Sequence, residues 1–165
     1  MSSALFDLSV PVYIKCLESL SAFLKKGEQW AVDNNVPKQT LLDGKIADDM
    51  KPLPFQIQTC SNTAKFVAVR LGGLENEVWA DDETTFEQLY ERIAKTVVFL
   101  KKTDAKAFAG AESKELTLFG KFELTGMSYL QTFATPNFFF HMTMAYAVLR
   151  KAGAPVGKFD FLGNP

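Results

Sequence analysis

The stretch from Leu124 to Leu149 contains no Asp, Glu, Lys or Arg, and this absence of charge strongly limits how the chain folds. A helix that is apolar on every side lies either in a bilayer or inside a protein core, and about 20 apolar residues span a bilayer. Polar side chains are nevertheless scattered through the stretch, and hydrocarbon would leave them without partners. They are Thr125, Ser128, Gln131, Thr132, Thr135, Asn137, His141 and Thr143. We therefore predict a helix from Thr125 to Lys151 that is surrounded by other helices and not by lipid.

Apolar spacing predicts two long helices in the first half of the chain. The first covers Ser9–Asn34, with Ser9 as the N-cap and Pro11 in the first turn. A short helical turn from Pro37 to Leu42 follows. The second long helix covers Leu53–Leu71, where apolar residues recur every three or four positions. That spacing is typical of a helix that packs along its length against another helix.

A third helix is predicted after the acidic run at 81–83. We expect Thr84 and Glu87 to form a capping box at its N-terminus, because a Thr hydroxyl and a Glu three residues later satisfy the first free backbone donors. Its apolar stripe consists of Phe86, Leu89, Tyr90, Ile93, Val97 and Leu100. The pattern indicates that one face of this helix is buried against the others.

Between the third and fourth helices, residues 115–119 and 121–124 alternate polar and apolar types around Gly120. This alternation predicts a small β-hairpin, and two strands alone are marginally stable, so the hairpin must pack on the helices. No repeat, low-complexity tract or long linker interrupts the chain. We therefore expect residues 1–165 to form one all-α domain, a bundle of four helices with a small hairpin.

Charge and cysteine content exclude several classes of protein. The net charge is -1, so no basic face is indicated and nucleic-acid binding is not expected. Cys16 and Cys60 are too few and too far apart for a disulfide framework or a zinc knuckle. The first residues lack the basic segment of a signal peptide, which predicts a cytoplasmic protein.

Pro136 marks the most informative candidate site, because a proline inside a helix removes one backbone donor and distorts the preceding turn. Asn137 and His141 follow at a spacing of four, so they share one face of the helix. An imidazole and a carboxamide beside such a distortion favour a pocket for a small, largely apolar molecule. In that pocket His141 would act as the acid or base, and Asn137 would polarise a carbonyl. The other residues expected to bind the ligand are Tyr13, Gln56, Cys60, Phe140 and Met144.

A purely structural interpretation of the same residues stays open. His141 then bonds the Thr132 carbonyl that Pro136 leaves without its usual partner. The run Phe138–Phe140 packs in the core, and Cys60 is an inert buried thiol. Of Gln56 and Gln58, only one is expected to point inward.

Three segments of the chain stand out together: residues 49–58 (DMKPLPFQIQ) with 63–66; residues 83–86 (ETTF) with 92–95; and residues 136–141 (PNFFFH) with 145–146 and 157–163. They resemble DUF1993, a family defined by a domain of unknown function and grouped with the DinB/YfiT-like helical bundles. The similarity runs from Pro11 to Gly163 and implies an up-down-down-up four-helix bundle that is commonly dimeric.

The resemblance also bears on whether the chain binds a divalent metal ion. The wider superfamily, which includes thiol-dependent transferases and isomerases, binds a divalent metal through one histidine on the second helix and an H-x-x-x-H pair on the last. Here Asn137-x-x-x-His141 has that spacing with Asn in the first place, and His141 is the chain's one histidine. Because zinc and nickel sites need three or four converging ligands, we expect neither a metal nor another cofactor. Cys60 or Asp48 would have to substitute in a rearranged site.

Three functions therefore remain as hypotheses. The first is a metal-free protein that binds a small organic molecule beside Asn137 and His141, with or without acid–base catalysis by His141. The second is a metal-dependent transferase or isomerase of the DinB type with a rearranged ligand set. The third is a non-catalytic dimeric interaction protein. We expect a small organic ligand and a homodimer, with no nucleic-acid or membrane partner.

Overall fold

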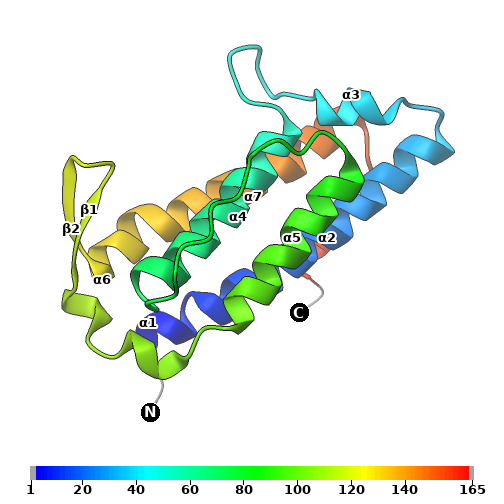
Figure 1. Cartoon of the computed structure of the whole chain (residues 1–165). Helices are drawn as coiled ribbons and strands as arrows, with labels where there is room; N and C mark the ends of the chain where they lie inside the picture. Colours follow the sequence, from blue (N-terminus) through cyan, green and yellow to red (C-terminus); the bar gives the residue numbers. More distant parts are fainter. Residues whose placement is uncertain (1–2, 164–165) are drawn as a thin grey trace.

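The computed structural model describes residues 3–163 and contains four long helical units that lie side by side (Figure 1). They are α2 (Val10–Asp33), α4 (Leu53–Arg70), α5 (Phe86–Lys101) and a last unit made of α6 (Gly126–Tyr129), η3 (Leu130–Ala134) and α7 (Thr135–Ala152). Along the chain they run up, down, down and up (Figure 1). The predicted all-α bundle is therefore confirmed, with helix ends close to those expected.

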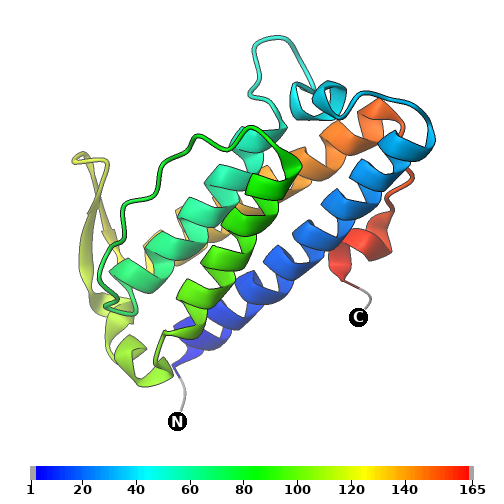
Figure 2. The same ribbon diagram turned by 45° about the vertical axis from the view of Figure 1, so that its right-hand side comes forward.

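Short elements close the bundle. The antiparallel hairpin of β1 (Glu115–Leu118) and β2 (Phe122–Thr125) confirms the predicted strands, and Leu116 pairs with Leu124 in its register. Figure 2 shows α8 (Lys158–Leu162) lying against α2 near the C-terminus. The remaining short elements are α1 (Ala4–Asp7), α3 (Lys38–Leu42), η1 (Ala105–Phe108) and η2 (Ala111–Ser113). Among residues 3–163, no helix has the length and apolarity that crossing a bilayer requires.

Helix α4 lies between α5 and α7 and is the most enclosed helix of the bundle. The predicted apolar seam is fully buried at Leu53, Ile57 and Cys60, as expected for a helix packed on two sides. The expectation that only one of Gln56 and Gln58 points inward is wrong, because both are buried. Gln58 donates to Glu83 at 3.0 Å, so the segment after α4 covers it.

That segment, residues 71–85, exists because α4 and α5 run in the same direction. The chain must return along the whole length of the bundle before α5 begins, and Figures 1 and 2 show it passing beside α4. We call residues 71–85 the strap. It carries little regular structure of its own and depends on side chains of α4 and α5 for its position.

Two predicted caps differ from the structure. The capping box of α5 is formed by Thr85 and Gln88, one residue later than predicted, because the backbone of Thr85 is the last extended one before the helix. Ser9 is the N-cap residue of α2, as predicted, but its hydroxyl donates back to the Leu5 carbonyl and accepts no hydrogen bond from the first turn of α2.

The predicted distortion at Pro136 takes the form of η3, a π-helical segment directly before α7. A π-turn bonds residue i to residue i+5, so the helix continues past a proline that lacks an N–H. Pro136 then occupies the first turn of α7, where a missing donor is tolerated.

Candidate functional site

The outer faces of α4 and of the last helical unit form the walls of a groove of about 280 Å³, which the hairpin closes at one side. Helices contribute to it at intervals of three or four residues, so one face of each helix supplies its wall. We call it the aromatic groove. Its lining is Thr59, Asn62, Thr63, Phe66 and Arg70 from α4; Leu118 and Phe119 from the hairpin; and Tyr129, Phe133 and Asn137 from the last unit.

Aromatic rings form the middle of this groove. Phe133 stacks on Tyr129 with ring centroids 6.1 Å apart and meets Phe119 edge-on at 5.5 Å. Phe119 reaches this position from the hairpin turn, where its backbone has a left-handed φ of 56° that non-glycine residues seldom adopt. Its side chain is 72% exposed, so a large apolar surface faces the groove and solvent together.

One end of the aromatic groove is polar and uncharged. The Asn137 amide donates to the Thr63 hydroxyl at 2.8 Å and so joins α7 to α4. This hydrogen bond engages the amide nitrogen and so fixes the orientation of the Asn137 amide. The Asn137 side-chain carbonyl oxygen is then the group left to accept a hydrogen bond. Asn137 is half-buried, as a residue at the edge of a groove must be.

The opposite end is cationic. The Arg70 guanidinium lies over the rings of Phe66, at 4.6 Å, and Tyr129, at 5.2 Å, and donates to the Tyr129 hydroxyl at 2.9 Å. Burial raises the pKa of Tyr129, and the adjacent guanidinium opposes this shift only in part. Tyr129 is therefore a protonated phenol near neutral pH, with its O–H still available as a donor.

His141 lies one turn beyond Asn137 and is not among the residues that line the aromatic groove. Its Nδ1 donates to the Gln56 carbonyl oxygen at 2.7 Å, while the Gln56 amide donates to the Lys51 carbonyl at 2.9 Å. These bonds assign the Nδ1-protonated tautomer to the neutral ring. The ring is thus held by Gln56 and not by the Thr132 carbonyl, which corrects the structural interpretation. Phe55 and Phe140 meet it edge-on.

The stability of the folded chain is expected to decrease through His141 as the pH falls from about 7 to about 5.5. Burial lowers the pKa of this imidazole, so the folded protein takes up its proton less readily than the unfolded chain does. Above the pKa that the imidazole has in the unfolded chain, the ring is neutral and fully compatible with folding. Stability is lost as the pH falls below that pKa towards the lower pKa of the imidazole in the folded protein. Urea denaturation across this range is expected to show a flatter pH profile for His141→Gln, and equal profiles would contradict the assignment.

The other predicted ligand-binding residues are dispersed. Tyr13 is in the core, where its hydroxyl bonds Thr135 at 3.0 Å and its ring stacks on Phe138 at 4.6 Å. Cys60 is fully buried against the Phe138 carbonyl, and burial raises the pKa of its thiol. Phe140 is 53% exposed and Met144 is half-buried. Only Asn137 of the predicted set lies in the aromatic groove.

The sequence interpretation missed Arg70, Phe66, Tyr129 and Phe133. A usable signal was present, since Tyr129, Phe133 and Asn137 recur every four residues on one helix face. On α4, Thr59, Phe66 and Arg70 are seven and then four residues apart, which also places them on one helix face. Nothing in the sequence showed that these two faces meet under the hairpin.

The residues present do not fit the metal site that the superfamily resemblance implies. The positions of its paired ligands hold Asn137 and His141, which bond Thr63 and Gln56 of α4. Within the described part of the chain, no three His, Cys, Asp or Glu side chains converge. A divalent zinc or nickel ion needs such a set, so no chemical step is assigned to a metal here.

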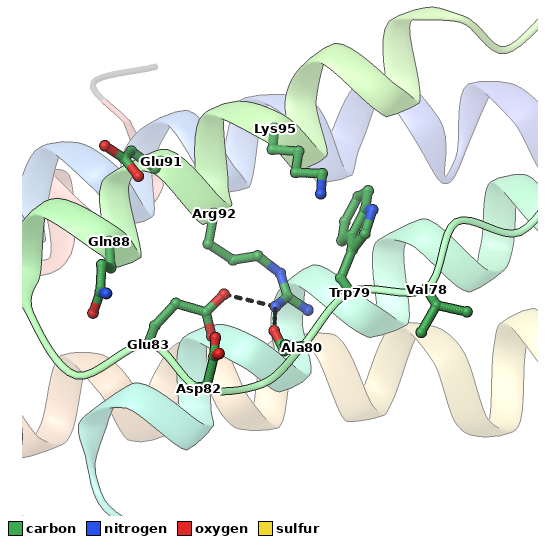
Figure 3. Close-up of a pocket in the computed structure, with 9 residues that line it drawn as sticks. All are labelled: Val78, Trp79, Ala80, Asp82, Glu83, Gln88, Glu91, Arg92 and Lys95. Atoms are coloured by element: carbon green, nitrogen blue, oxygen red, sulfur yellow. Dashed lines mark hydrogen bonds and ion pairs between the residues drawn. The ribbon is translucent and has the colours of Figure 1, made fainter.

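A second cavity, of about 340 Å³, lies between the strap and α5 (Figure 3). Arg92 forms its floor and donates five hydrogen bonds: to Ser61, Asn62, the Ala80 carbonyl, Asp81 and Glu83. A guanidinium has five N–H donors, so the protein itself occupies all of them. Arg92 is 3% exposed. We conclude that it fixes the strap and is not free to bind a ligand.

Comparison with known proteins shows a matching family and a similar solved structure. The model of DUF1993, a domain of unknown function, matches residues 5–162. The fold is similar to that of a DinB family member protein from Shewanella denitrificans, with a TM-score of 0.92 and 36% sequence identity over 96% of this chain and 92% of that chain. No curated protein matches the chain.

Proposed function

The chain belongs to DUF1993, a family of unknown function with a DinB-like fold, and we propose that it binds a small, largely apolar organic molecule in the aromatic groove without a metal ion. The observation that carries the proposal is the composition of that groove, which has aromatic rings in its middle and hydrogen-bonding groups at both ends. Small-molecule sites have this character: an apolar wall that supplies affinity and a few polar groups that set orientation. Its volume of about 280 Å³ suits a ligand of one ring.

The proposal assigns binding and not acid–base catalysis to the groove. His141, the candidate acid or base, pairs with Gln56 beyond the groove lining. A general base must come within hydrogen-bond reach of the proton that it removes. The donor set among the described residues does not fit the metal-dependent alternative. The homodimer and the interaction role stay predictions.

Thermal unfolding in the presence of a library of neutral and charged aromatic compounds tests the proposal. At a concentration about 100 times its Kd, a ligand stabilises the native state by about 2.7 kcal/mol, which corresponds to about 5–10 °C in Tm for a chain of this size. We expect at least one such compound, and we expect Thr59→Trp to abolish its effect by filling the groove.

Thr143→Trp is the matched control, since Thr143 is exposed on α7 and lies outside the groove lining. It is expected to keep the full ligand-induced shift. The proposal fails if no compound raises Tm, or if both tryptophan variants respond to the ligand as the unmodified protein does.

A further inference from the structure

Arg70 differs from Arg92 in how its guanidinium is bonded. Arg92 has every N–H bonded within the protein, whereas among residues 3–163 the side-chain hydrogen bond from Arg70 goes to Tyr129 alone. The salt bridges among residues 3–163 involve Lys26, Lys38, Arg92 and Lys102, and none involves Arg70. A guanidinium at the wall of an apolar groove therefore keeps most of its donors for another group.

The surroundings of Arg70 hold its guanidinium in place before any ligand arrives. It lies 4.6 Å from the Phe66 ring and 5.2 Å from the Tyr129 ring, contacts that restrict a long and otherwise flexible side chain. A planar guanidinium held in this way presents a fork of N–H groups that matches the two oxygens of a carboxylate.

Tyr129 adds a second donor at this end. Its hydroxyl accepts a hydrogen bond from Arg70, so its own hydrogen is free to donate to an anion. The pair Arg70–Tyr129 thus offers charge-assisted hydrogen bonds from two side chains on different helices. Such bonds are stronger than those between neutral groups, particularly where apolar rings exclude water.

The opposite end of the groove requires a different group. Thr63, which fixes Asn137, precedes Arg70 by seven residues, and at 1.5 Å per residue the two ends are about 10 Å apart. The Asn137 carbonyl oxygen is oriented to accept, so the far end of a ligand is best filled by a hydroxyl donor. One aromatic ring fits the middle, against Phe133 and Phe119.

We propose that the molecule bound in the aromatic groove is a hydroxyaryl carboxylate, whose carboxylate binds Arg70 and Tyr129, whose ring packs on Phe133, and whose hydroxyl donates to Asn137. This inference rests on the proposed function and names the ligand class of the same site. It involves binding alone and no bond-breaking step.

Calorimetric titration with 3-(4-hydroxyphenyl)propanoate and with its primary amide tests the inference, because the two probes differ chiefly in charge. We expect the carboxylate to bind at least about tenfold more tightly than the amide. Arg70→Gln is expected to remove this preference, because it weakens binding of the carboxylate more than binding of the amide. Arg150→Gln, on the exposed end of α7, is expected to preserve it.

Tyr129→Phe is the second variant, and it keeps the buried ring if Arg70→Gln does not fold. It is expected to weaken carboxylate binding severalfold and to weaken amide binding less. Equal binding of both probes to the unmodified protein would overturn the carboxylate assignment and leave the proposed function intact. The same conclusion would follow if other library compounds bound to the protein and neither probe did. If no compound of any class binds, both proposals fall.

Discussion

Replacement of Arg92 by methionine is expected to lower the free energy of unfolding by about 3–5 kcal/mol, a large part of the stability of a chain of this size. The substitution keeps an unbranched side chain but removes all five donors, three of which bond the strap at Ala80, Asp81 and Glu83. Glu83, whose side chain is 11% exposed, would then keep a charge without its arginine partner. An uncompensated buried charge is the main reason why breaking such a pair costs so much. Urea denaturation followed by circular dichroism measures the difference.

Arg150→Met provides the control for the Arg92 substitution. Arg150 is exposed near the end of α7, and its side chain donates a long hydrogen bond of 3.3 Å to the Ala154 carbonyl. Surface substitutions of this kind change stability by less than about 0.5 kcal/mol. If Arg92→Met cost no more than Arg150→Met, the strap would not depend on Arg92.

Replacement of Gly126 by alanine is expected to destabilise the protein by about 3 kcal/mol, at the upper end of the range for overpacking. The added Cβ would collide with the Ala111 carbonyl oxygen, and the Leu71 side chain lies 3.0 Å away. Neither neighbour gives way easily, because one is backbone and the other is buried. The Gly126 N–H also donates to the Lys114 carbonyl at 2.8 Å, so a shift at this position disturbs the junction between η2, the hairpin and α6.

Gly157→Ala is the matched control for Gly126→Ala. A Cβ at Gly157 meets its nearest neighbour, an Asp160 carboxylate oxygen, at an ordinary 3.7 Å. Its backbone is extended, so no left-handed conformation has to be maintained. Thermal and urea unfolding are expected to show a change within about 0.5 kcal/mol. Similar losses in the two variants would show that the close approach at Gly126 does not determine stability.

The sequence predicts the bundle well because each long helix carries a buried face at regular spacing. The seam through Leu53, Ile57 and Cys60 is such a face, and the structure buries it completely. Helix ends are less well determined, because adjacent residues compete for the same cap. Thr84 and Thr85 differ by one position, and only the backbone conformation selects Thr85.

The candidate site was predicted only in part, because it depends on contacts between distant segments. Asn137 was singled out by its place after Pro136. Arg70 and Phe119 join it only once the hairpin folds over α4, and no local pattern encodes that approach. His141 was assigned by its chemistry, yet its pairing with Gln56 requires the register of α7 on α4. That register depends on η3, which the sequence indicated only as a distortion at Pro136.

The most direct test of the account is the crystal structure of the protein with the compound that raises its Tm most. We predict that the compound lies in the aromatic groove, with its ring against Phe133 and Phe119 and with no metal ion among its contacts. A compound bound elsewhere, with the groove empty, would contradict the account, as would a metal ion coordinated by His141.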